Sequence, residues 1–335
     1  MVSVRCFTYN HSKYITDALN GFVMHETNFP FVVVVVDDAS TDGEQDVIKS
    51  FVNEHFDINN VNAENRETEY AHITCAPHKS NKNCSIVVLY LKYNHYQIKK
   101  KKLPYLSEWL DNSKYHALCE GDDYWIDPLK LQKQVDFLEA NLEYGMCYTR
   151  VKRYNEEKQE LIDEFGGPNT TFEELISKNT VPTLTVVFRR ELQQQYQVDV
   201  CPEKQNWKMG DYPMWLWFAH ESKIGFLPEI TGVYRILENS ASHLHDLKQL
   251  SNFYNSGVDI MEFYNRKYSL GYDSKYFHRL RCRIACKVAV LHGNMMLYIQ
   301  EFVRYIRTDY TALIDYKCYG YMLFFFCKKL KNRHI

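Results

Sequence analysis

Three acidic side chains stand close together in the stretch HALCEGDDYWIDPLKLQKQ, residues 116–134. Glu120, Asp122 and Asp123 follow an apolar run directly and precede an expected helix start. Like charges at such spacing repel one another unless a cation, hydrogen-bond donors or a ligand compensates them. Mg²⁺ and Mn²⁺ prefer oxygen ligands, and they commonly bind one or two protein carboxylates together with substrate phosphates. The cluster therefore predicts a Mg²⁺ or Mn²⁺ site completed by a nucleotide diphosphate, whose departure the ion would assist.

Further acids follow other expected element ends. Asp37 and Asp38 end the β-branched run FPFVVVVV, and Asp211 stands at the start of a helix expected in QNWKMGDYPMWLWFAH. Ligands of open parallel sheets bind outside the carboxyl ends of the strands. We therefore expect three acid-bearing loops at such ends: Asp37 with Asp38, the first cluster, and Asp211. Simpler roles stay open: Asp38 and Asp123 can stabilise turns or helix caps, and Asp211 can be a first-turn acid favoured by the helix dipole.

The elements around these acids alternate between strand and helix. A strand from Val2, a helix from Ile15 capped by Ser12, and a strand over residues 29–36 form a right-handed crossover unit, and the last run is typical of a strand buried on both faces. Residues 59–83 form a polar segment. The pattern indicates an α/β domain, residues 1–241, with a mostly parallel central sheet flanked by helices. The helical, aromatic remainder predicts a helical C-terminal extension, residues 242–335.

Composition excludes several classes of protein. The 335 residues are 45% hydrophobic, which indicates a folded chain, and 40 basic against 42 acidic side chains predict no nucleic-acid partner.

Ten scattered cysteines and a start without a signal peptide predict reduced thiols and a cytoplasmic location. The apolar stretch YGYMLFFFC is shorter than the ~20 residues that span a bilayer. The chain lacks GxxxxGK[ST] and an early GxGxxG, which disfavours ATPases and nicotinamide dehydrogenases.

Five segments occur in an order that resembles glycosyltransferase family 2: VSVRCFTYN, VVVVVDDASTD, ALCEGDDYW, MGDYPMW and GVYRILENSASH. The resemblance covers about residues 2–243. It implies a GT-A fold and an inverting, metal-dependent enzyme that moves a hexose-type sugar from a nucleotide-diphosphate donor to an acceptor hydroxyl. It also suggests bacterial surface polysaccharide assembly, with a saccharide or a lipid-linked saccharide as the acceptor.

The resemblance also implies roles for single residues. The nucleoside pocket would be lined by Thr8, Tyr9 and Asn10, and its base and ribose would be contacted by Asp37 and Asp38. Asp122 would bind the metal, with Glu120 and Asp123 assisting through metal-bound water or ribose contacts. Asp211 would take the proton from the acceptor hydroxyl, so that one in-line displacement inverts the anomeric carbon.

The chain departs from the family pattern at two positions. Glu120 replaces the Asp that usually starts the metal motif, and Leu237 stands where many relatives carry a histidine. His243, or alternatively His245, is the substitute that we expect as a further metal ligand. Arg235 either holds a donor phosphate bidentately or pairs with a carboxylate.

Other readings of the sequence stay open. A non-catalytic nucleotide-sugar binder or membrane-associated scaffold would keep the same fold, and a nucleotidyltransferase would share the sheet topology. Trp125, Trp215 and Trp217 either stack on sugar or belong to the core. Zinc could also bind to three residues that lie on one helical face: His278, Cys282 and Cys286.

Two basic segments have alternative roles as well. The run Lys99 to Lys102 is typical of a solvated loop and could also meet an anionic acceptor. The tail YMLFFFCKKLKNRH, residues 321–334, either packs on the catalytic domain or lies on an anionic membrane surface as a peripheral attachment.

Overall fold

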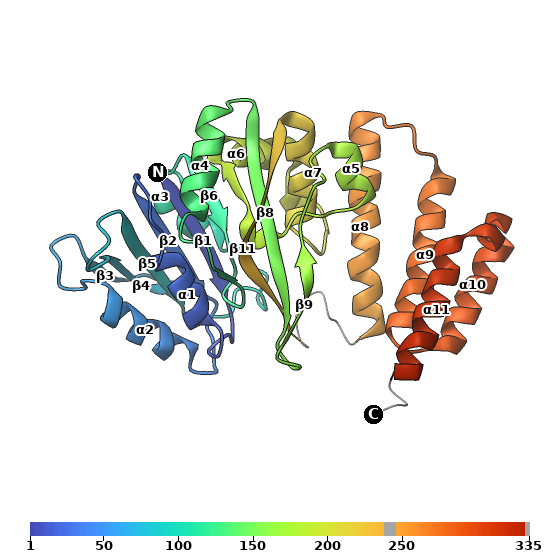
Figure 1. Ribbon diagram of the computed structural model, residues 1–335, viewed down its shortest axis with the longest axis horizontal. Coiled ribbons are helices and arrows are strands. Elements are labelled where there is room, and N and C mark those ends of the chain that lie inside the picture. Colours follow the sequence, from blue (N-terminus) through green and yellow to red (C-terminus); the bar gives the residue numbers. More distant parts are fainter. Residues whose placement is uncertain (238–245, 332–335) are drawn as a thin grey trace. The chain divides into compact units, whose positions relative to one another are not determined.

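The computed structural model describes residues 1–237 and 246–331 (Figure 1). The chain forms two compact units. The first comprises residues 1–200 and 214–236, and the second comprises residues 201–213 and the described part of 237–335. The domain boundary expected between residues 241 and 242 lies outside the described residues.

The first unit is built on one large sheet. Its strands in chain order are β1 (Val2–Thr8), β2 (Phe31–Asp37), β3 (Glu64–Glu67), β4 (Ala71–Pro77), β5 (Cys84–Leu91), β6 (Tyr115–Leu118), β7 (Tyr124–Trp125), β8 (Tyr144–Asn155), β9 (Glu160–Phe165), β10 (Val187–Arg189) and β11 (Lys223–Ile236). They lie in the order β3-β4-β5-β2-β1-β6-β10-β8-β11-β7, with β9 on β8. Strands β5, β2, β1 and β6 are parallel neighbours, as are β8 and β11. The α/β class is confirmed, and the sheet is mixed: its β5-β2-β1-β6 core is parallel, whereas β3, β4, β7, β9 and β10 pair antiparallel.

Helices connect these strands. They are α1 (Ile15–Val23), α2 (Glu44–His55), α3 (Ser107–Leu110), α4 (Lys130–Ala140), α5 (Phe172–Ser177), α6 (Arg190–Val200) and α7 (Asp211–Glu221). Short 3-10 turns cover η1 (Leu103–Leu106), η2 (Thr183–Thr185) and η3 (Pro202–Lys204). Helix α7 begins in the second unit and continues into the first.

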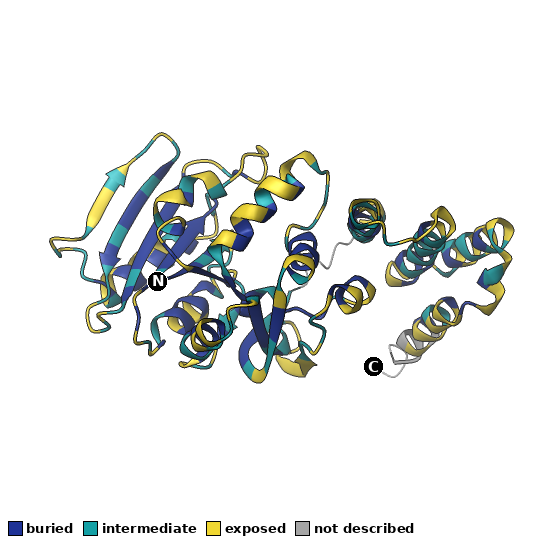
Figure 2. Ribbon diagram, turned by 90° about the horizontal axis from the view of Figure 1, so that it is seen from above, coloured by how far each residue is buried: buried dark blue, intermediate teal, exposed yellow. Residues whose placement is uncertain are grey.

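Strand β2 is buried on both faces, as its run of valines predicts. Val33 and Val35 share one apolar cluster with α1, α2 and α4. Val34 and Val36 share another with η1 and α3. The strands around β2 are correspondingly buried in Figure 2. Burial on both faces fixes this strand firmly, and its carboxyl end carries Asp37 and Asp38.

One local expectation is wrong, and one polar segment contains strands that its sequence does not indicate. Ser12 does not cap α1, because the cap position is Tyr14 and the Ser12 N–H instead donates to Asp42 Oδ2 over 2.9 Å. The polar segment 59–83 contains strands β3 and β4, which pair antiparallel beside β5. Three of the four β3 residues are exposed, so this strand lacks the apolar alternation that would reveal it.

The second unit contains long helices: α8 (Leu247–Tyr268), α9 (Ser274–Leu291), α10 (Met295–Thr308) and α11 (Tyr316–Lys331), with η4 (Tyr310–Ile314) before the last. Side chains of Asp246, Asp273 and Asn294 accept hydrogen bonds at the starts of the first three, as good caps do. Helix α9 packs against α8, α10 and α11. The helical character expected from residue 242 onward is found over 247–331. No helix in the described parts is long and apolar enough to cross a membrane.

Candidate active site at the carboxyl edge of the sheet

Three loops meet at one edge of the first unit's sheet because β1, β2 and β6 are parallel neighbours. Thr8, the last residue of β1, pairs in register with Asp37, the last residue of β2. Beyond β6 the chain continues alongside β1, where Gly121 N–H donates to the Phe7 carbonyl over 3.1 Å. The acids after β2 and those after β6 therefore flank the end of β1, as the strand pattern predicts.

Gly121 allows this close approach. A Cβ atom at this position would clash with the Thr8 side chain, only 2.6 Å from its Cβ. Any larger residue would push the loop that carries Asp122 away from β1. Packing against Thr8 thus explains why a glycine stands between Glu120 and Asp122.

The segment Thr8–Asn10 is fastened to the turn before α2. The Thr8 hydroxyl donates to Glu44, whose other carboxylate oxygen accepts the His11 N–H over 2.9 Å. Asn10 has a left-handed φ of 57° and accepts the Thr41 N–H over 2.8 Å. Burial raises the pKa of Glu44. Sequence reasoning missed Glu44, because a first-turn acid usually needs no explanation beyond the helix dipole.

Asp37 is fully buried and only partly satisfied. Its Oδ2 accepts from Gln45 Nε2 over 2.6 Å and from the Ser40 N–H over 3.3 Å. Its Oδ1 has no hydrogen-bond partner anywhere in residues 1–237 or 246–331. Burial is the main reason why the pKa of Asp37 is raised. A buried acceptor without a donor is costly, which makes this oxygen a candidate ligand contact.

Asp38 holds the loop that follows β5. Its carboxylate accepts the N–H groups of His95 (2.7 Å) and Tyr96 (3.2 Å) and Nζ of Lys102 (2.9 Å). Asp38 is only 1% exposed, and Lys102 also lies over the Phe7 ring at 5.0 Å. Within the Lys99–Lys102 run, Lys102 is thus an anchor and not a solvated side chain.

The acids after β6 differ in their surroundings. Asp123 is buried, accepts the Arg235 N–H over 2.8 Å, and has a pKa raised first by burial and then by Asp122. Asp122 is half-buried, and its carboxylate makes no hydrogen bond or ion pair within the part of the chain that the structure describes. Glu120 is exposed. Asp122 is therefore accessible to a ligand, unlike the buried Asp123.

Arg235 pairs with carboxylates, one of its two expected roles. Its guanidinium donates to Asp17, to Glu156 over 3.2 Å and to the Asp122 carbonyl over 2.9 Å. It also lies 4.5 Å from the centre of the Tyr124 ring. Sequence reasoning missed Asp17 and Glu156, which lie far from Arg235 in the chain. A contact with donor phosphate stays a prediction.

The carboxylates suit a shared cation better than a cation held by protein alone. Among the described residues, no group of three or more His, Cys, Asp or Glu side chains can hold a metal. A single carboxylate such as that of Asp122 fits a divalent ion whose other ligands are phosphate oxygens and water. His243 and His245 lie outside the described residues, so a histidine ligand stays a prediction.

Asp211 begins α7, and its Oδ1 accepts the Tyr212 N–H over 2.7 Å. It belongs to the second unit, whereas Asp37, Asp38 and Asp122 belong to the first. Its role as the base stays a prediction.

Tyr9 and Asn10 are exposed beside Thr8 and are available to a ligand.

Burial and geometry bear on two alternatives from the sequence. The three tryptophans, Trp125, Trp215 and Trp217, are at most 3% exposed and belong to the core. The zinc alternative gains no support: Cys282 Sγ contacts His278 Nε2 at 3.5 Å, but no described group completes a metal site there.

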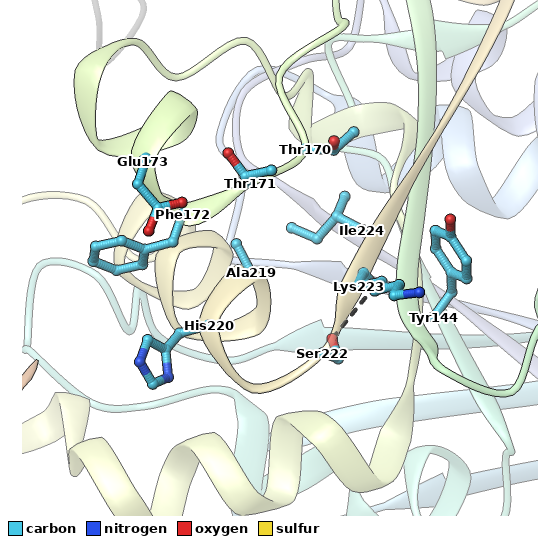
Figure 3. Close-up of a pocket in the computed structure, with 10 residues that line it drawn as sticks. All are labelled: Tyr144, Thr170, Thr171, Phe172, Glu173, Ala219, His220, Ser222, Lys223 and Ile224. Carbon is cyan, nitrogen blue, oxygen red and sulfur yellow. Dashed lines mark hydrogen bonds between the residues drawn. The ribbon is translucent and has the colours of Figure 1, made fainter.

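An open pocket of about 450 Å³ lies elsewhere on the first unit (Figure 3). It includes Tyr144 and Lys223, which begin β8 and β11. Because β10 is antiparallel to both β6 and β8, strand β8 runs parallel to β6. The pocket therefore lies at the amino ends of the strands, on the edge opposite to Asp37 and Asp122.

Comparison with known proteins confirms the family resemblance. Residues 3–89 match the model of glycosyl transferase family 2. This segment contains Thr8, Asp37 and Asp38, whereas Asp122 and Asp211 lie beyond it. The uncharacterized proteins Rv1520 of Mycobacterium tuberculosis and Mb1547 of Mycobacterium bovis are 29% identical over 245 residues. The match covers 70% of this chain and 58% of each relative's length.

A solved structure of a mannosyltransferase agrees with this chain in fold. The mannosyltransferase PcManGT from Pyrobaculum calidifontis, solved with GDP-Man and Mn²⁺, has a TM-score of 0.50 at 13% identity, over 91% of this chain and 75% of that one. Residues 1–349 of TarS from S. aureus have a TM-score of 0.47 at 17% identity, over 90% and 88% of the two chains. The fold of this chain is GT-A, with a helical C-terminal region.

Proposed function

We propose that this chain transfers a sugar from a nucleotide-diphosphate donor to an acceptor hydroxyl, with inversion at the anomeric carbon. The observation that carries the proposal is the meeting of Thr8, Asp37 and Asp122 at the carboxyl edge of three parallel strands. Ligands of open α/β sheets bind at this edge. The family match over residues 3–89 supports the same class of reaction.

On the donor side, the unsatisfied Asp37 Oδ1 would accept a hydrogen bond from the nucleoside, beside the Thr8–Asn10 segment. Asp38 and Lys102 would hold the neighbouring loop in place. Glu120 and Asp123 would contact ribose or metal-bound water, and Arg235, held by Asp17 and Glu156, would fix the backbone of Asp122. Asp122 would hold Mn²⁺ or Mg²⁺, with His243 or His245 as the expected additional ligand. When bound, the ion would neutralise charge on the departing diphosphate.

On the acceptor side, Asp211 would take the proton of the attacking hydroxyl. The new bond forms between that oxygen and the anomeric carbon, while the bond from this carbon to the diphosphate oxygen breaks. Attack from the face opposite to the leaving group inverts the configuration. The proposed acceptor is a saccharide or a lipid-linked saccharide in surface polysaccharide synthesis, and the proposed location is the cytoplasm.

Thermal unfolding in the presence of UDP-sugars or GDP-sugars tests donor binding. A donor present at 100 times its dissociation constant, with Mn²⁺, should stabilise the protein by about 2.7 kcal/mol. Asp122→Ala should remove the part of this stabilisation that depends on Mn²⁺, whereas Asp136→Ala, at an exposed acid on α4, should keep it. Equal stabilisation of Asp122→Ala and the parent protein would contradict the metal site.

Turnover separates the enzyme from the alternatives. Asp211→Asn should keep donor binding and lose sugar transfer by a factor of about 10² to 10⁴, the usual contribution of a general base. A parent protein that binds donor and transfers no sugar to any acceptor, water included, would be the non-catalytic binder. Release of pyrophosphate from a nucleoside triphosphate would instead indicate a nucleotidyltransferase.

A further inference from the structure

The segment α10–η4–α11 of the second unit exposes large apolar side chains. They recur at helical spacing on the outer sides of α10 and α11 and also lie on η4. The most exposed include Met296 (67%), Ile299 (49%), Ile314 (82%), Tyr316 (75%), Leu323 (63%) and Phe324 (53%), which together we call the hairpin face. Side chains on the opposite sides of the same helices, such as Tyr298, Tyr305 and Cys318, are buried within the unit. The hairpin face is thus the solvent side of an amphipathic pair of helices.

One ring contact beside the hairpin face joins α10 and α11. The Phe302 ring of α10 lies 5.7 Å from the Tyr319 ring of α11, and the Tyr319 hydroxyl donates to the Leu313 carbonyl over 2.8 Å. Ile299 lies one turn from Phe302, and Leu323 lies one turn from Tyr319. The exposed side chains of Ile299 and Leu323 therefore each lie one helical turn from the Phe302–Tyr319 contact.

The charges around the hairpin face have one sign. Between residues 291 and 325, the exposed side chains that carry a fixed charge are basic: Arg304, Arg307 and Lys317. On α10, Arg307 follows the exposed apolar residues Ile299 and Val303 at four-residue steps, so an apolar stripe ends at a basic group. On α11, Lys317 is the direct neighbour of Tyr316. Basic side chains therefore border the apolar face on both helices.

The acids of this segment are turned inward. Asp309 accepts a hydrogen bond from Arg279 over 2.6 Å, and Asp315, which is 2% exposed, pairs with Arg283. Glu301, with 25% side-chain exposure, lies 3.9 Å from Arg304. The acids therefore do little to offset the positive charge at the surface.

We propose that the hairpin face docks on the surface of an anionic lipid bilayer. Such a surface accepts apolar and aromatic side chains below the headgroups and places basic side chains beside lipid phosphates. A second copy of the same face would instead bring basic side chains opposite basic side chains, which disfavours a symmetric dimer. The inference does not depend on sugar transfer, and it needs no helix that crosses the membrane.

Vesicle binding by the full chain, without donor or metal, tests the proposal. The protein should sediment with phosphatidylcholine vesicles that contain phosphatidylglycerol, and far less with phosphatidylcholine alone. Arg307→Glu with Lys317→Glu should weaken binding about tenfold or more, because each basic residue near an anionic surface contributes a few-fold in affinity. Ile314→Asp with Leu323→Asp should weaken it similarly by removing apolar insertion.

The matched control reverses two charges elsewhere on the same unit. Lys248→Glu with Lys275→Glu changes exposed residues of α8 and α9 and should leave vesicle binding nearly unchanged. Circular dichroism checks that every variant is folded. Three results would overturn the proposal: no binding to anionic vesicles, equal loss in the control, or a dimer in sedimentation that only the aspartate variants dissociate. Because donor binding is measured separately, its failure would leave this inference intact.

Discussion

Nζ of Lys102 donates a hydrogen bond to Oδ2 of Asp38 over 2.9 Å, although the residues are 64 positions apart. The Asp38 side chain is 1% exposed and that of Lys102 is 20% exposed, so water can replace this donor only in part. The pair ties the loop after β5 to the carboxyl end of β2.

Replacing Lys102 should therefore loosen the loop that Asp38 holds. Lys102→Met leaves a buried carboxylate short of a donor, and the free energy of unfolding should fall by about 1 to 3 kcal/mol. Lys101→Met, at an exposed neighbour, should change it by less than about 0.5 kcal/mol. Urea denaturation measures both, and equal stability of the two variants would contradict the anchoring role.

Gly121 provides a second test, because it has no room for a methyl group. Gly121→Ala should lower the free energy of unfolding by about 1 to 3 kcal/mol, since β1 or the Asp122 loop must move. Gly257→Ala in α8 has no atom within 4 Å of the added carbon and should instead stabilise by about 0.5 to 1 kcal/mol. If thermal unfolding shows both variants more stable than the parent, Gly121 has no packing role.

Arg235 should contribute to stability because its planar guanidinium donates hydrogen bonds to three acceptors. Arg235→Lys keeps the charge and loses the fork, so the free energy of unfolding should fall by about 1 to 3 kcal/mol. Arg150→Lys, at a half-exposed pair with Glu164, should cost less than about 1 kcal/mol. If Arg235→Lys instead lowers donor affinity sharply and leaves the free energy of unfolding unchanged, the main role of Arg235 is phosphate binding and not pairing with carboxylates.

Lys130 should make stability depend on pH. It is fully buried, lies 4.0 Å from the Trp125 ring centre and donates to Gln134 over 2.7 Å. Burial lowers its pKa from 10.5 to about 7. Between these values the unfolded chain binds more protons than the folded one, so the contribution of Lys130 to stability rises with pH above about 7.

The variant Lys130→Met should remove this dependence. Its stability relative to the parent should be greatest at or below pH 7 and should decline as pH rises toward 9. Lys133→Met, at a partly exposed lysine of the same helix, should show no comparable trend in the difference. Denaturation at several pH values measures both differences, and a flat difference for Lys130→Met would rule out the lowered pKa of Lys130.

Much of the sheet edge could be predicted from the sequence because β-branched runs and terminal acids are local signals. The run ending at Asp37 indicates a doubly buried strand, and the parallel order then places Asp37 near the acids after β6. The polar strand β3 has no such signal, since its side chains are mostly exposed. Its existence depends on pairing with β4.

Partners distant in the chain could not be predicted. Lys102 appears in a run of lysines typical of a solvated loop, and only the folded chain brings it to Asp38. The roles of Glu44 with Thr8 and of Asp17 with Arg235 likewise require contacts between separate elements. A resemblance can suggest that Arg235 is important, but a pattern cannot show which acid it meets.

Strand β11 runs from Lys223 at one edge of the sheet to Ile236 at the other, and its register against β8 is irregular between Phe226 and Gly232. Side chains alternate between the faces of a strand, so deleting one residue between Gly232 and Arg235, where the register is regular, would turn Arg235 to the opposite face and away from Asp123. Natural variation in chain length should therefore be excluded from this part of β11. It should be tolerated in the hairpin between β8 and β9, where residues 157–159 are the exposed part of the turn.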